Sequence, residues 1–173
     1  MKTKTIILLA TIMTILTVSF SACENKSKDI TPPTIEEASF LPADCDIYYL
    51  GDTIRVYFIC WDDTELGNFN IEIHNNFDHH THGTSAVDCD GEEHHHEEGE
   101  EHHHDHEPVE GAWVFNQDYA ISRGLKTDMV DMQIRVPEDV LEGDYHFMVR
   151  LTDHAGWQTL KSVPIHLHDA NEK

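Results

Sequence analysis

The chain has 173 residues and a formal net charge of −22 at pH 7, with 33 acidic residues against 11 lysines and arginines. This charge excludes nucleic acid as a partner, because phosphate would be repelled, and it makes cations the natural counter-charge. The length suits a single domain.

The first residues have the pattern of a secretory signal peptide. Residues 1–4 are basic, residues 6–20 are uncharged and largely apolar, and Ser21 and Ala22 offer small side chains at a cleavage point. The apolar stretch is too short for a membrane span, which needs about 20 apolar residues. We therefore expect residues 1–22 to be removed on export.

Cys23 at the cleavage point indicates the kind of signal. Phe20-Ser21-Ala22-Cys23 resembles a bacterial lipobox, although Phe20 stands where leucine is usual. The resemblance implies that Cys23 becomes the first residue of the exported chain and carries a lipid anchor. Ordinary secretion with an incidental cysteine is the alternative. Residues 23–30 are polar and are interpreted as a tether.

Short runs of alternating apolar and polar residues follow the tether, which is typical of strands. Turn signals separate these runs, and no long apolar stretch has helical periodicity. The pattern over residues 31–170 predicts an all-β domain, a seven-stranded immunoglobulin-like β-sandwich. The expected strands cover residues 33–41, 53–61, 68–74, 113–119, 129–136, 145–152 and 159–168.

Residues 77–110 do not share this alternation. They fall between the third and fourth expected strands, strands C and D of the immunoglobulin-like order, and have almost no apolar residue after Val87. Such a segment cannot bury enough apolar surface to fold, so we expect a long disordered insertion. A loop of this length is either functional or disordered, and a solubilising loop is the simpler reading.

Histidine is concentrated in this insertion. Eleven of the 15 histidines lie between residues 74 and 106, interleaved with Asp and Glu. Imidazole binds Zn²⁺, Cu²⁺ and Ni²⁺, and carboxylates raise the local cation concentration. Because neither HExxH nor CxxC is present, labile multi-site binding is predicted in place of a fixed zinc site. The candidate ligands here are His74, His79, His80, His82, His94, His95, His96, His102, His103, His104 and His106.

Three further candidate ligands lie on the last two expected strands. Alternation directs His146, His166 and His168 outward. Strands C, F and G share one sheet in an immunoglobulin-like sandwich, so these residues should meet His74 at one end of one face. This predicts a zinc site supported by the sheet, with ordinary surface histidines as the alternative. His154 falls at the opposite end and is interpreted as incidental.

Three cysteines remain besides Cys23. Cys45 and Cys89 both fall at the histidine end of the expected topology, so they are the favoured disulfide in an exported chain. Cys60 lies on the inward side of its strand, which fits a buried free thiol. A metal thiolate at Cys89 is the competing interpretation.

Catalytic motifs are absent from the sequence, which has neither a GxSxG elbow nor a phosphate loop, so we expect no enzyme. Acid pairs such as Asp62-Asp63 are interpreted as turn and surface charges. The expected function is an envelope protein that buffers, senses or delivers zinc, with copper or nickel as alternatives. The rival hypotheses are an adhesion or assembly module for protein or glycan, and a polypeptide-binding accessory to an envelope transporter with a histidine pH switch.

Three stretches, together with the lipobox, carry a family resemblance. They are residues 31–35, 71–82 and 144–147. They are similar to an uncharacterised bacterial lipoprotein family of the Bacteroidota type, domain of unknown function 4625. The resemblance implies a lipoprotein linked to the outer membrane, facing the periplasm or the cell surface, and implies no activity.

Overall fold

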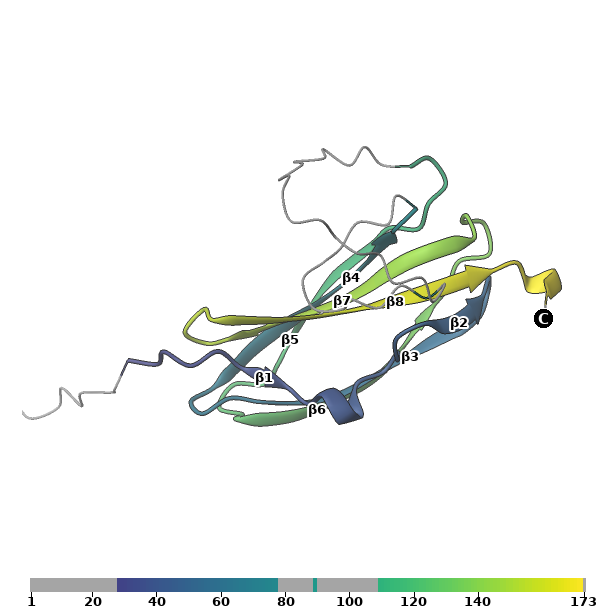
Figure 1. The fold of residues 1–173 in the computed structure, drawn as a ribbon. Helices are drawn as coiled ribbons and strands as arrows, with labels where there is room; N and C mark the ends of the chain where they lie inside the picture. The colour runs from purple at the N-terminus through teal and green to yellow at the C-terminus, as the bar shows by residue number, and fades with distance from the viewer. Residues whose placement is uncertain (1–27, 78–88, 90–108, 173) are drawn as a thin grey trace, which may run out of the picture.

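The computed structural model describes residues 28–77, 89 and 109–172 and contains eight strands in that part of the chain (Figure 1). Two short 3₁₀ turns, Glu37–Ser39 and Ala170–Glu172, accompany them. No helix among the described residues is long and apolar enough to cross a membrane. The strands are β1 Thr34–Ile35, β2 Asp46–Tyr49, β3 Thr53–Trp61, β4 Leu66–Asn75, β5 Phe115–Ala120, β6 Thr127–Arg135, β7 Gly143–Asp153 and β8 Gln158–His168.

These strands form two sheets that face each other as layers (Figure 1). One sheet has three strands in the order β1-β3-β6, and the other has five in the order β2-β8-β7-β4-β5. Neighbouring strands in both sheets run antiparallel, except β2 and β8, which are parallel. The prediction of an all-β protein is confirmed, and the two sheets are those of a β-sandwich.

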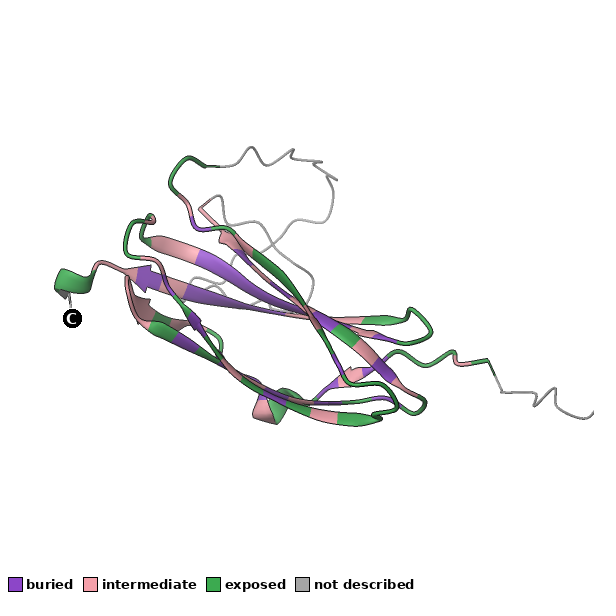
Figure 2. Ribbon diagram, turned by 180° about the vertical axis from the view of Figure 1, so that it is seen from behind, coloured by how far each residue is buried: buried purple, intermediate pink, exposed green. Residues whose placement is uncertain are grey.

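Alternating side chains from both sheets fill the core, which Figure 2 shows as repeated buried positions along the strands. In β3 every second residue from Ile54 to Cys60 is fully buried. Burying one such aliphatic or aromatic side chain contributes about 1.5–3 kcal/mol, so this alternation stabilises the sandwich strongly. The buried residues of β4, β7 and β8 that face this core are Leu66, Phe69, Ile71, Ile73, Tyr145, Phe147, Val149, Leu151, Val163, Ile165 and Leu167.

The eight strands differ from the expected seven at the N-terminal side of the domain. The expected strand at residues 33–41 is reduced to β1, because the chain turns through the 3₁₀ segment and returns to the sheet only at a single bridge between Leu41 and Tyr57. The additional strand is β2, whose parallel pairing with β8 runs from Asp46 opposite Ile165 to Tyr49 opposite His168. Four residues are too few to show alternation.

The strand that follows the insertion, β5, joins the five-stranded sheet beside β4. In the same sheet β7 lies between β4 and β8, so the ends of β4 and β8 flank the start of β7. This arrangement determines which side chains meet at that end of the sheet.

Candidate functional site

Four predicted ligands lie at one end of the outer face of the five-stranded sheet. His74 in β4 is directly opposite His146 in β7, and their ring centroids are 5.6 Å apart. His166 and His168 follow in β8 with a centroid separation of 6.3 Å. Residues opposite each other on neighbouring strands share a face, so the structure brings these imidazoles to one surface.

Two carboxylates contact these histidines. Glu72 Oε1 lies 3.1 Å from His74 Nδ1, and Asp144 Oδ1 lies 2.5 Å from His166 Nδ1. A carboxylate at Nδ1 orients the ring and directs Nε2 away, as in many metal-bound histidines. These acids were not predicted as site residues, although each stands two residues before a histidine of the same strand. We call the six residues Glu72, His74, Asp144, His146, His166 and His168 the histidine face.

Burial is uneven across the histidine face. His146 is only 7% exposed, whereas His74, His166 and His168 are partly buried. The neighbours of His146 on this face, Met148, Ser162 and Pro164, are buried as well. Since β7 is the central strand of this sheet, its outward side chains have neighbours on both sides. The His146 ring is therefore held by packing and is not an ordinary surface side chain.

A disulfide joins Cys45 to Cys89 at the edge of this face. The Cys45 amide donates a hydrogen bond of 2.9 Å to the carbonyl of Pro164, the residue opposite His146. Cys89 is thereby held beside β8, and its sulfur cannot serve as the thiolate ligand of the competing interpretation. Cys60 is a buried free thiol, and burial raises its pKa to about 11.

The other predicted site residues fall outside the described part of the chain. They are the expected lipid attachment site Cys23 and the insertion histidines His79, His80, His82, His94, His95, His96, His102, His103, His104 and His106.

Three carboxylates meet at the opposite end of the sandwich. Asp29, Asp62 and Asp153 each present an oxygen within 4.8 Å of the other two. In the described ranges this is the one group of three or more acidic, histidine or cysteine side chains whose ligand atoms come so close. Asp62 accepts hydrogen bonds from the following turn, as interpreted, but it is not a surface charge, because the residue is only 3% exposed. Asp63 is exposed, as interpreted. Sequence reasoning missed this group since its members come from three distant segments.

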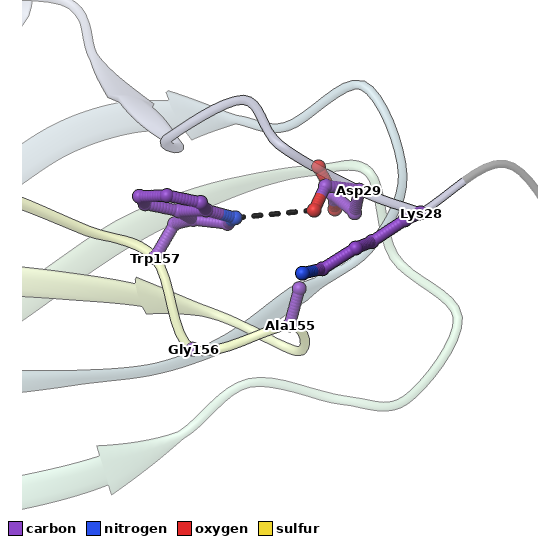
Figure 3. A pocket seen from close by; sticks show the side chains of 5 residues that line it. All are labelled: Lys28, Asp29, Ala155, Gly156 and Trp157. Carbon is purple, nitrogen blue, oxygen red and sulfur yellow. Dashed lines mark hydrogen bonds between the residues drawn. The ribbon is translucent and has the colours of Figure 1, made fainter.

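A pocket lies beside these acids, where the N-terminal segment crosses the β7–β8 turn (Figure 3). It is lined by Lys28, Asp29, Ala155, Gly156 and Trp157. The indole Nε1 of Trp157 donates a hydrogen bond of 3.2 Å to the carbonyl of Asp29, which attaches the segment to the turn.

Comparison with curated proteins gives no match. Among solved structures, catalytically inactive OgpA from Akkermansia muciniphila, in complex with an O-glycopeptide (glycodrosocin) substrate, is 14% identical with a TM-score of 0.42; the match covers 85% of this chain and 32% of that one. The sporulation control protein Spo0M from Bacillus subtilis is 11% identical with a TM-score of 0.40, over 80% of this chain and 50% of that one. The chain thus spans half or less of the length of each.

A family model supplies the clearest relationship. The model described as "Domain of unknown function (DUF4625)" matches residues 21–168, which includes every described strand. The resemblance drawn from the sequence is therefore confirmed, and the chain belongs to the DUF4625 family.

Proposed function

We propose that this protein is a non-enzymatic lipoprotein of the cell envelope that binds a divalent transition metal through the histidine face, for buffering, sensing or delivery. Zinc is the leading candidate, with copper or nickel as alternatives. The observation that carries the proposal is the meeting of four imidazoles and two carboxylates on three adjacent strands. The immunoglobulin-like type of the sandwich and the lipid anchor at Cys23 belong to the same proposal.

Ring spacing supports a shared ion. Two imidazoles on one tetrahedral zinc have centroids about 5 Å apart, given a Zn–N distance of ~2.1 Å. The His74–His146 and His166–His168 centroids are 5.6 and 6.3 Å apart, so small side-chain rotations would bring either pair onto one metal. Glu72 and Asp144 would then act as orienting partners or as further ligands.

The sequence around the face supports the same function. The chain carries a net charge of −22, which attracts divalent cations to its surface. The insertion contributes ten more histidines by sequence, and the disulfide at Cys89 attaches it next to Pro164.

Calorimetric titration with zinc at pH 7.4 tests the proposal, using protein expressed without residues 1–23. We expect the double change His166→Gln and His168→Gln to weaken the tightest zinc-binding phase at least tenfold, because glutamine keeps a polar side chain but removes the imidazole. The control is His154→Gln, which alters an exposed histidine at the far end of β7. A double variant that binds zinc like the wild type would contradict the proposal, as would a wild type that binds none.

A second set of variants separates the insertion from the sheet. Replacing the ten insertion histidines by asparagine, with Cys89 kept, should remove weaker sites and leave the tight phase. Both phases should weaken below about pH 6.5, where histidine side chains generally gain a proton and stop ligating metal.

One observation favours the adhesion or assembly alternative. On the outer face of the three-stranded sheet, Trp61 and Met129 are 46% and 58% exposed, and Met129 lies opposite Ile59 on the neighbouring strand. Exposed apolar side chains that gather on one face mark interaction surfaces. A protein or glycan partner that stays bound in EDTA and is lost on Trp61→Ser would favour this alternative over metal binding.

A further inference from the structure

The three acids at the anchor-side end of the sandwich converge from separate segments. Asp29 precedes β1, Asp62 follows β3 directly, and Asp153 is the last residue of β7. Three Asp side chains with one oxygen each inside 4.8 Å concentrate negative charge at one point.

Backbone amides fix one oxygen of each carboxylate. Asp62 Oδ1 accepts hydrogen bonds from the amides of Thr64 and Glu65 at 2.8 and 2.7 Å. Asp153 Oδ1 accepts hydrogen bonds from the amides of Gly156 and Trp157 at 2.6 and 2.8 Å. Asp29 Oδ1 accepts one from the amide of Thr31 at 3.1 Å. These bonds hold all three carboxylates in a defined orientation.

The second oxygen of each carboxylate has no hydrogen-bond partner among the described residues. Oδ2 of Asp29, Asp62 and Asp153 is buried, and the Asp62 and Asp153 residues are each only 3% exposed. An ionised carboxylate removed from water without a partner is strongly unfavourable. A positive charge where the three carboxylates converge would offset this cost.

We propose that Asp29, Asp62 and Asp153 bind a calcium ion. Calcium binds carboxylate oxygens at about 2.4 Å, so two of its ligands lie at most ~4.8 Å apart. One oxygen from each of the three aspartates lies within 4.8 Å of the other two, which meets this condition. Mg²⁺ binds oxygen at ~2.1 Å and retains much of its water, so it fits this set less well. Zinc prefers nitrogen and sulfur donors, whereas the three side chains that converge here are all carboxylates. Water completes the coordination from the side of the pocket.

The ion would cross-link the N-terminal segment to the rest of the domain. It would join the residues before β1 to the β3–β4 and β7–β8 turns. It would add to the hydrogen bonds that Trp157 donates to the Asp29 carbonyl and that the Thr31 hydroxyl donates to Asp63. Cys23 lies six positions before Asp29 in the sequence. Calcium would therefore set how the domain is oriented on its expected lipid anchor, independently of the histidine face at the other end.

Thermal unfolding tests the site with Asp62→Asn and Asp153→Asn in protein expressed without residues 1–23. Asparagine keeps the Oδ1 acceptor for the backbone amides and replaces Oδ2 by a donor that cannot bind calcium. In EDTA we expect both variants to melt at or above the wild-type temperature, because one repulsive charge is gone. In millimolar calcium the order should reverse, with only the wild type and the control Asp139→Asn, an exposed turn acid, raised in melting temperature.

Terbium luminescence gives a direct measure of binding at the same site. Tb³⁺ occupies calcium sites, and excitation of the adjacent Trp157 should sensitise its emission, with calcium displacing it. The Asp153→Asn change should raise the calcium Kd at least tenfold while leaving zinc binding at the histidine face unchanged. Equal melting of the wild type in EDTA and calcium, or an Asp153→Asn variant that responds like the wild type, would overturn the proposal.

Discussion

Tyr145 shows how one buried hydroxyl joins two connecting segments. Its ring is fully buried, and its hydroxyl donates to the carbonyl of Leu141 at 2.8 Å while accepting from the Trp113 amide at 3.1 Å. The bond to a carbonyl four residues upstream has the form of a tyrosine corner. Burial raises the pKa of Tyr145, since the phenolate would lose its hydration, while the Trp113 amide opposes this shift.

We expect Tyr145→Phe to lower the free energy of unfolding by about 1–3 kcal/mol, because the Leu141 carbonyl and Trp113 amide both lose their partner. Urea unfolding at pH 7 measures this change. Tyr57→Phe, on the outward side of β3, is the control and should stay within about 0.5 kcal/mol of the wild type. Equal losses in the two variants would show that the hydroxyl bonds of Tyr145 do not contribute specifically.

At the scale of the element, the Cys45–Cys89 disulfide links the residue before β2 to the insertion across a sequence separation of 44 residues. A cross-link of this span restricts the unfolded chain and typically contributes about 2–4 kcal/mol. We expect Cys45→Ser with Cys89→Ser to lower the free energy of unfolding by that amount, measured in urea. Reduction of the wild type should give the same loss. An unchanged transition midpoint would contradict the prediction.

A strand could be predicted from the sequence where its own residues alternate between apolar and polar. The predicted strand at residues 53–61 matches β3 in both bounds, because nine alternating residues determine it without help from partners. By contrast, β2 is defined by its parallel neighbour β8, and no short-range pattern shows it. Strand length and partner dependence thus separate the elements that the sequence predicted from those it did not.

The two candidate sites also differ in whether they could be predicted from the sequence. The histidine face could be predicted because spacing by two residues and strand order place His74, His146 and His166 together. The three-carboxylate site could not, because Asp29, Asp62 and Asp153 have no common spacing and meet only through the packing of both sheets. Aspartate is also common in ordinary turns, so its presence there does not indicate a site.

At the scale of the whole molecule, four weak acids in the described part of the chain have raised pKa values. Burial is the first cause for Cys60, Tyr48, Tyr119 and Tyr145, and the charge of Asp46 adds to it at Tyr48. Each group holds its proton more tightly in the folded than in the unfolded protein. Their stabilising contribution is complete below the unfolded pKa values of about 8.5 for cysteine and ~10 for tyrosine, and it is lost as pH rises further.

Unfolding free energy should therefore be level near neutral pH and decline above about pH 9, as Cys60 begins to ionise in the unfolded chain. Urea midpoints measured between pH 7 and 11 test this expectation. In Cys60→Ala the decline should begin closer to pH ~10, where only the tyrosines contribute. Stability that stays level to pH 11 in the wild type would contradict it.

Cys89 divides the insertion into two segments of unequal length. Eleven residues separate Phe77 from Cys89, and nineteen separate Cys89 from Val109. A shorter segment gives its side chains a higher effective concentration at the surface to which both its ends are attached. His79, His80 and His82 belong to the short segment, so under the proposed function they would reach an ion on the sheet more readily than the seven histidines of the long one. Reducing the disulfide would merge the two segments, and under the same proposal metal retention would then depend on the redox state of Cys45 and Cys89.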